Sequence, residues 1–388
     1  MRNFLKTIKK YIRNPLYEIA EIGMYDWSLL IFIFFLLFVG IIESMSITPV
    51  RLEDISLRLF FKHLITMCLG IICFLFTAFV FDYKLYKEKK ITLFIFIILI
   101  AMLVAVLVFG KETKGATRWL DLGIIKMQPS ELAKIAFALI ATKILSKKQI
   151  FENNFGKKFW ITIGCFVVFT ALIILQRDLG TVVLLGLTFT AILIITGATW
   201  KRIIITDAFF SICAILFVYI EAYRTTRITD YFNSLSDWTK SSDNVRSAII
   251  ALGSGGIFGK GLGQSEMKLL HLSEAHTDFV FPIIGEEGGF FGASLIILSF
   301  VIIVLKAFKI SEKCDDDFGK NLAFTIGVMF AIQAIINMGM SIGVLPTKGM
   351  PLPFISYGGS SMLYSLITTG ILFNISRKNK YGQYFNNN

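Results

Sequence analysis

Charged residues are scarce in this chain. Asp, Glu, Lys and Arg make up only 17% of its 388 residues, whereas soluble domains contain about 25%. The hydrophobic set reaches 55%, and Phe alone accounts for 38 residues. This composition excludes an ordinary soluble fold and also a disordered chain, because disorder requires few apolar residues. The apolar residues fall in long blocks, so we expect the chain in a membrane.

Cysteine is also sparse. None of the five cysteines forms a CxxC pair or a Cys/His cluster at ligand spacing, so neither a disulfide framework nor a structural zinc site is expected. The basic N-terminus leads into a long apolar block without a small-residue cleavage signature, which predicts an uncleaved span. The net charge of +12 lies in short basic runs between apolar blocks. Such runs are typical of membrane topology signals, and we expect no nucleic-acid partner.

The apolar blocks predict an all-α polytopic membrane protein with about ten transmembrane helices, since one crossing needs about 20 apolar residues. A segment 1–26 precedes the helical domain 27–375, a tail 376–388 follows it, and a long loop 221–277 separates helices seven and eight. The expected spans are 27–45, 64–81, 91–109, 132–145, 159–175, 179–197, 203–220, 290–305, 322–340 and 357–375.

The distribution of Lys and Arg predicts that both termini lie on the inner side of the membrane. Four polar, glycine- or proline-marked stretches then fall on the outer side. Irregular backbone at membrane depth survives only where protein buries it or where it lines a water-filled cavity. We therefore expect an outward-opening cavity formed by residues 115–131, 176–178, 273–278 and 345–359.

Glu131 and Lys134 are ionisable residues at the start of the fourth predicted span. Each would cost about 2.5–3.5 kcal/mol at a helix centre. Their i, i+3 spacing places them on one helix face, where they can pair. The pair is either a structural device that lets a marginal helix insert or part of a functional site.

Asp278 lies where the long loop enters an apolar segment. A carboxylate in a partly dry place is a candidate general base or cation ligand. The alternative is an N-cap of the eighth helix, which stabilises by about 1 kcal/mol. Glu286 and Glu287 follow about two turns deeper. They either line the same cavity or pair with a basic residue that the sequence does not identify.

Residues 345–361 contain three prolines and the pair Gly358-Gly359, which exclude a continuous helix. Free N–H groups at a helix start can hold phosphate, and Lys348 suits an anionic ligand. A plain re-entrant turn is the alternative. In Arg118-Trp119, either Arg118 binds phosphate or Trp119 anchors an interfacial helix. A cavity with these groups suits an amphiphile with a phosphate head better than it suits a soluble ion, because no ring of like charges occurs.

Several of these stretches, taken in order from about Tyr25 to the C-terminus, resemble the SEDS family (shape, elongation, division and sporulation proteins). The stretches are Gly115-Ala-Thr-Arg118-Trp119, Gln128-Pro-Ser-Glu131-Leu-Ala-Lys134, Gln176-Arg-Asp178-Leu-Gly-Thr, Glu274-Ala-His-Thr-Asp278-Phe, Ile284-Gly-Glu-Glu287, Pro346-Thr-Lys-Gly349 and Ser356-Tyr-Gly-Gly-Ser-Ser361. Glu274-Ala-His-Thr-Asp278 and Pro346-Thr-Lys-Gly349 resemble the FtsW-like division subfamily more than the RodA-like elongation subfamily. Trp119-Leu-Asp-Leu-Gly123 favours the RodA-like one.

The resemblance implies a multi-pass peptidoglycan glycosyltransferase of the bacterial inner membrane. Such an enzyme polymerises lipid II into undecaprenyl-linked glycan and works with a class B penicillin-binding protein, a transpeptidase, and with other division or elongation proteins. A lipid II flippase and a non-catalytic scaffold are the rival functions. Discriminating among the three requires assays of polymer formation, lipid translocation and partner binding.

The resemblance also implies roles for individual residues. Asp278 would deprotonate the acceptor sugar hydroxyl, or hold a divalent cation (Mg²⁺ or Mn²⁺) with Glu131 as a further ligand. Glu131 and Lys134 match an acid–base pair near that site, and Arg118 and Lys348 would hold diphosphate. The other matching residues expected at the substrate are Trp119, Gln128, Gln176, His276, Thr277, Ser356, Tyr357 and Gly358.

Three residues depart from the family pattern. Arg177 stands where a proline is usual, and Pro282 and Gly288 replace Ala and Leu. We expect Pro282 to kink the helix just beyond Asp278, because proline breaks helical hydrogen bonding.

Overall fold

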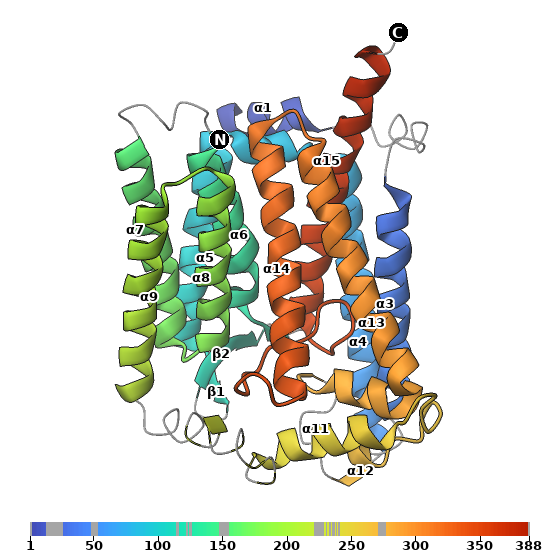
Figure 1. Ribbon diagram of the computed structural model, residues 1–388. Helices are drawn as coiled ribbons and strands as arrows, with labels where there is room; N and C mark the ends of the chain where they lie inside the picture. The colour runs from blue at the N-terminus through green and yellow to red at the C-terminus, as the bar shows by residue number, and fades with distance from the viewer. Residues whose placement is uncertain are drawn as a thin grey trace.

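The computed structural model describes residues 2–12, 26–47, 53–113, 116–121, 123, 126–146, 155–220, 229, 231, 232, 234, 237, 239, 241–270 and 277–386. Within them, every predicted span contains a helix, and the helices run side by side in a bundle (Figure 1). They are α3 (Trp27–Ile47), α4 (Glu53–Leu75), α5 (Lys89–Phe109), α6 (Pro129–Leu145), α7 (Phe155–Leu175), α8 (Leu179–Ile195), α9 (Trp200–Ile220), α13 (Val280–Glu312), α14 (Asp317–Ser341) and α15 (Gly359–Asn386).

The helical membrane fold is confirmed, while the ten crossings and their direction stay predictions. In the described part of the chain, six helices are long and apolar enough to cross a membrane. Helix α6 is weakly apolar because it lies inside the bundle. Most of its side chains, Glu131 and Lys134 included, are buried against protein. Protein surrounds this helix on most sides, so a strongly apolar sequence is not required.

The two ends of the bundle differ in structure (Figure 1). One end carries both chain termini, α1 (Arg2–Tyr11) and the 3₁₀ helix Tyr83–Lys87. There Tyr11 Oη donates to Glu88 Oε1 at 2.6 Å. The opposite end carries α11 (Asp243–Ser254), α12 (Met267–Leu270) and the strands. The polar stretches of the sequence therefore meet at one end, as the spans predicted.

The expected helical class is confirmed, and a small antiparallel sheet accompanies the helices. It has the order β1-β2-β3 and lies between α5 and α6. Its strands are too short for a recognisable alternation of apolar and polar residues. Strand β2 places Arg118 beside the turn between α7 and α8. The strands are β1 (Lys111–Thr113), β2 (Ala116–Asp121) and β3 (Lys126–Met127).

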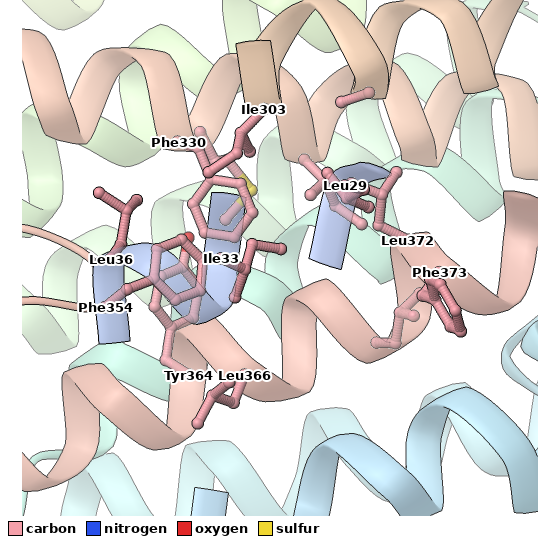
Figure 2. Packing of buried hydrophobic residues seen from close by; sticks show 14 of the residues in the cluster. Leu29, Ile33, Leu36, Ile303, Phe330, Phe354, Tyr364, Leu366, Leu372 and Phe373 are labelled. Carbon is pink, nitrogen blue, oxygen red and sulfur yellow. The ribbon is translucent and has the colours of Figure 1, made fainter. Parts of the chain in front are cut away.

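The apolar core has two main parts. One joins α3, α13, α14 and α15, and Figure 2 shows Leu29, Ile33 and Leu36 among Ile303 and Phe330. The other joins α5 to α9 and is rich in phenylalanine. Helices α6, α8 and α14 contact one another where the two parts meet. The buried Glu131–Lys134 pair and Gln333 lie at this junction.

Helix α13 is broken at a glycine, and the predicted kink at Pro282 is wrong. The backbone leaves the helical region at Gly289, with φ 65° and ψ −164°. Pro282 lies in the first turn of α13, where a helix does not use the N–H group that proline lacks. A glycine adopts positive φ at little cost, so the break occurs there.

Residues 256–261 satisfy the backbone groups that this break leaves free. Phe290 N donates to Gly256 O at 2.8 Å, and Phe291 N donates to Ile257 O at 3.2 Å. In the other direction, the amides of residues 260 and 261 donate to the carbonyls of residues 286 and 287 at 2.9 and 3.1 Å. Unsatisfied backbone groups are costly at membrane depth. The loop after α11 therefore holds both halves of α13 in place.

The substitution Gly289→Ala tests this arrangement. A Cβ at Gly289 would lie 2.3 Å from Gly259 N, at a positive φ. We expect a loss of about 2 kcal/mol or more of stability, measured as a lower midpoint of thermal unfolding in detergent. Gly253→Ala is the matched control, because a Cβ there meets nothing within 4 Å. Equal midpoints for the two variants would contradict the proposed close contact.

Candidate active site

Helix α6 carries a buried charged pair. Lys134 Nζ lies 2.8 Å from Glu131 Oε2, and the two residues are 1% and 4% exposed. Lys134 Nζ also donates to Gln333 Oε1 at 3.3 Å and lies 4.2 Å from the ring centre of Tyr364. The predicted i, i+3 pair therefore forms. A carboxylate, an amide oxygen and an aromatic face together offset the cost of burying the ammonium group.

Two amides of α14 connect this pair to the end of the bundle that carries α11, α12 and the strands. Gln333 Nε2 donates to Pro351 O at 2.9 Å. One turn along the helix, Asn337 Nδ2 donates to Met350 O at 2.7 Å and to Asp278 O at 2.9 Å. Both amides are fully buried. They were not among the predicted site residues, although amide side chains in an apolar span are a recognised functional signal.

Asp278 immediately precedes the cap of α13. The N-cap residue is Phe279, so the interpretation of Asp278 as the cap is wrong. A Cβ built on Gly349 would lie 3.0 Å from Asp278 Oδ2. The half-buried carboxylate of Asp278 therefore faces the backbone of the 346–358 loop, next to the half-buried Lys348. The predicted convergence of Asp278 with the proline-rich segment is observed.

The 346–358 loop is held by contacts of its own. Ser356 Oγ accepts a hydrogen bond from Leu352 N at 2.8 Å and is buried. Phe354 has a φ of 67°, a conformation that side chains other than glycine rarely adopt. The ring of Tyr357 lies 5.8 Å from that of His63, and Gly358 is half-buried. Ser356 therefore shapes the loop from inside.

Asp178 joins the starts of three helices. Its Oδ2 accepts hydrogen bonds from Gln128 Nε2 and Ser130 Oγ, both at 3.0 Å, and from Thr181 Oγ1 at 2.8 Å. Gln128 N donates to Ser360 Oγ at 2.6 Å, which adds the start of α15. Asp178 belongs to a motif that the sequence analysis quoted, but its bonding was not predicted. Gln128 thus lies within the polar cluster around Asp178 and Ser360.

Gln176 and Arg118 occupy the rim on the α5 side. The side chain of Gln176 is fully buried, and its Nε2 donates to Leu103 O at 3.0 Å. Arg118 donates to the carbonyl oxygens of Gln176 and Arg177, while Arg177 has a φ of 60°. The neighbouring Trp119 is half-buried in β2. Arg118 therefore braces the 176–178 turn, and the Gln176 amide faces the bundle interior.

Glu286 and Glu287 pair with lysines of the outer loop. Lys260 Nζ lies 2.9 Å from Glu286 Oε1, and Lys268 Nζ lies 2.6 Å from Glu287 Oε1. Ser46 of α3 also donates to Glu287 Oε1 at 2.8 Å. The hydrogen bond to Glu286 raises the pKa of Lys260, so the ammonium form is favoured. Of the two alternatives, pairing with a basic residue is correct.

The predicted cation site does not fit the residues present. Glu131 Oε2 is bonded to Lys134, so a cation would compete with a fixed ammonium group. Among the described residues, no three His, Cys, Asp or Glu side chains gather as metal ligands. Thr277 is half-buried beside Asp278, and His276 lies outside the described residues. A described route from Asp278 to Glu131 runs through the α14 amides and Lys134.

An apolar cavity of about 430 Å³ lies between α11, α13 and α14. Its lining includes Leu252, Phe281, Phe290, Met338 and Ile342. It contains no charged side chain, so it is distinct from the polar cluster around Asp278.

A family model described as "Cell cycle protein", for FtsW, RodA and SpoVE, matches residues 25–381. The chain belongs to this family. The "Probable peptidoglycan glycosyltransferase FtsW" of Shewanella sediminis is 35% identical over 370 residues, which cover 94% of this chain and 89% of that protein. The protein of the same name from Escherichia coli O6:H1 is 41% identical over 278 residues, covering 70% and 66%.

Solved structures agree with the FtsW/RodA/SpoVE fold. Rod shape determining protein RodA of Thermus thermophilus has a TM-score of 0.68 at 22% identity, covering 92% of this chain and 97% of that one. A chain from a structure described as "Structural coordination of polymerization and crosslinking by a peptidoglycan synthase complex" has a TM-score of 0.74 at 21% identity, covering 92% and 98%. The predicted resemblance is confirmed, and the curated relatives carry the FtsW name.

In this FtsW/RodA/SpoVE chain, the motif residues separate into two groups. Asp278 faces the 346–358 loop, which carries Lys348, and the Glu131–Lys134 pair contacts the α14 amide Gln333. Gln128 bonds to Ser360, just beyond this loop. Arg118, Trp119 and Gln176 form the rim at β2 and the α7–α8 turn. The first group brings charges of both signs to one end of the bundle.

The substitution Lys134→Met tests the energetics of the buried pair. It leaves the Glu131 carboxylate buried without its cation, which costs about 3–5 kcal/mol. We expect a lower thermal unfolding midpoint, and partial recovery in the double variant Glu131→Gln, Lys134→Met, because that variant removes both charges. A double variant no more stable than Lys134→Met alone would show that the two charges do not interact.

Proposed function

We propose that this chain is a peptidoglycan glycosyltransferase that polymerises lipid II at the outer face of the bacterial inner membrane during cell division. The carrying observation is the position of Asp278. Its carboxylate faces Gly349 beside Lys348, and its backbone is tied through Asn337 to the helix that contacts the Glu131–Lys134 pair. Membership of the family and the names of the curated relatives support this function.

The proposed reaction needs one base and fixed positive charge. Asp278 accepts the proton of the acceptor's sugar 4-hydroxyl while that oxygen bonds to the anomeric carbon of the growing strand. The bond from this carbon to the diphosphate oxygen breaks, and undecaprenyl diphosphate leaves. Lys348 and Arg118 offset the negative charge that develops on the leaving group, because preorganised cations favour such a transition state.

The buried pair has a supporting role in this proposal. Lys134 and Glu131 are almost inaccessible, so they act on the outer residues through Gln333 and the 346–358 loop. Gln333 accepts from Lys134 and donates to Pro351 O. This arrangement fixes the loop that faces Asp278. A divalent cation stays a prediction from the resemblance, and no step is assigned to it because Glu131 is bonded to Lys134.

A class B penicillin-binding protein is the proposed partner. One solved structure with this fold is described as a peptidoglycan synthase complex that coordinates polymerisation and crosslinking. This likeness supports the pairing. A polymerase and a transpeptidase in one complex would deliver new strands directly to crosslinking. Lipid II and undecaprenyl-linked glycan are the proposed substrate and product.

The substitution Asp278→Asn tests the assignment of the base. We expect glycan polymer formed from purified lipid II, with the partner present, to fall at least about 100-fold, the usual contribution of a general base. Asp243→Asn is the control, since Asp243 is an exposed aspartate at the start of α11. Binding of the partner should be the same for both variants.

The outcomes of that experiment separate the rival functions. Undiminished polymer from Asp278→Asn would overturn the enzymatic role of this residue. Translocation of labelled lipid II in vesicles without any polymer would identify a flippase. Partner binding with neither activity would identify a scaffold.

The substitution Lys348→Ala tests diphosphate binding. We expect polymerisation to fall about 100-fold, as when one stabilising donor is removed from an active site. Lys348→Arg should keep a larger share of activity because the charge remains. Lys313→Ala, at the C-terminal end of α13, is the control and should be neutral. Equal rates for Lys348→Ala and Lys313→Ala would exclude Lys348 from the site.

A further inference from the structure

One face of α15 carries buried hydroxyl groups without a hydrogen-bond partner. They belong to Ser361, Tyr364, Ser365 and Thr368, each of which is at most 5% exposed. Buried polar groups nearly always bond to protein or to ordered water. Four such hydroxyls within about two turns of one helix therefore indicate a common polar ligand.

The four residues share one side of the helix. Their spacing of i, i+3, i+4 and i+7 defines a single helical face. The opposite side contacts α4, where a Cβ on Gly70 would lie 2.5 Å from Leu366 Cδ1. In Figure 2, Tyr364 and Leu366 leave α15 in different directions. The hydroxyl face is thus turned away from α4.

This face passes the buried charged pair. The ring of Tyr364 lies 4.2 Å from Lys134 Nζ, and Lys134 is bonded to Glu131. At its outer end, the face begins next to Ser360, which bonds to the start of α6. Its outer end therefore lies in the polar cluster of the candidate active site.

The inner end of the face is closed by apolar residues. Ile371, Leu372 and Ile375 follow Thr368 on α15, and each is at most 1% exposed. The hydroxyl face does not continue across the bundle. A polar ligand on it has polar neighbours at the end that begins at Ser360.

Thr369, next to Thr368, shows that a hydroxyl on this part of α15 can donate to a carbonyl of its own helix. Thr369 Oγ1 donates to Ser365 O at 2.8 Å, the usual i−4 bond of threonine in a helix. The four orphaned hydroxyls make no such bond. These hydroxyls can therefore donate to, and accept from, a ligand that lies beside this face of α15.

We propose that this face of α15 is an internal water site that solvates the Glu131–Lys134 pair from the outer end. Water suits the site because each hydroxyl can both donate and accept, and buried water typically makes about three hydrogen bonds to otherwise unpaired polar groups. Water beside the pair stabilises two charges in the interior. The closed inner end keeps the site from becoming a path across the membrane.

The substitution Thr368→Val removes the hydroxyl and nearly preserves the shape of the side chain. Its thermal unfolding tests this proposal. Removing a dry, unpaired hydroxyl would raise the unfolding midpoint, because its desolvation cost disappears. Removing a hydroxyl bonded to water should lower the midpoint, by about 1–3 °C. Thr369→Val calibrates the loss of a bonded hydroxyl at the adjacent position. A midpoint for Thr368→Val equal to or above that of the parent protein would overturn the proposal.

Cysteine reactivity provides a second, independent measurement. Ser365→Cys and Leu366→Cys are compared in a chain whose five native cysteines have been replaced, using 2-aminoethyl methanethiosulfonate as the probe. We expect Ser365→Cys to react about tenfold faster or more, because a hydrated thiol ionises and the thiolate is the nucleophile. Equal rates would show a dry face. Neither measurement uses polymerisation, so a failure here is distinct from a failure of the proposed function.

Discussion

Two buried amides, Gln333 and Asn337, organise the polar interior of this protein. They lie one turn apart on α14 and bond to the carbonyls of the 346–358 loop. Gln333 also accepts from Lys134, and Asn337 also donates to the carbonyl of Asp278. Because a broken backbone must find partners inside the bundle, these amides determine where the proline-rich loop can lie. The loop in turn sets the surroundings of the Asp278 carboxylate.

A second constraint acts on the other side of Asp278. Helix α13 breaks at Gly289, and residues 256–261 complete its backbone hydrogen bonds. The ion pairs of Lys260 and Lys268 attach the same loop to Glu286 and Glu287. The first part of α13 is thereby held from the loop side and from the α14 side. An active site that must accept a large amphiphile benefits from a rigid frame of this kind.

Local signals predicted much of this structure. Long apolar blocks located the helices, and i, i+3 spacing paired Glu131 with Lys134, because both depend on residues close in sequence. The kink was predicted at Pro282, but a proline in the first turn removes no helical hydrogen bond. The helix breaks at Gly289 instead, because glycine adopts positive φ at little cost. The sheet, the role of Asp178 and the partners of Glu286 and Glu287 were not predicted. The bonds of Asp178, Glu286 and Glu287 join residues that are not neighbours in sequence, while the strands of the sheet are too short to be recognised from their residue pattern.

The sequence by itself determined the membrane environment, the helical class, the family and the pairing on α6, because composition and short spacings fix burial and local geometry. Only the tertiary structure decided which polar groups meet at one end of the bundle. Asp278 and Asn337 are 59 residues apart, and Lys134 and Gln333 are 199 apart. Contacts over such distances depend on how helices pack, since in the bundle each buried polar group must find its partner on another helix.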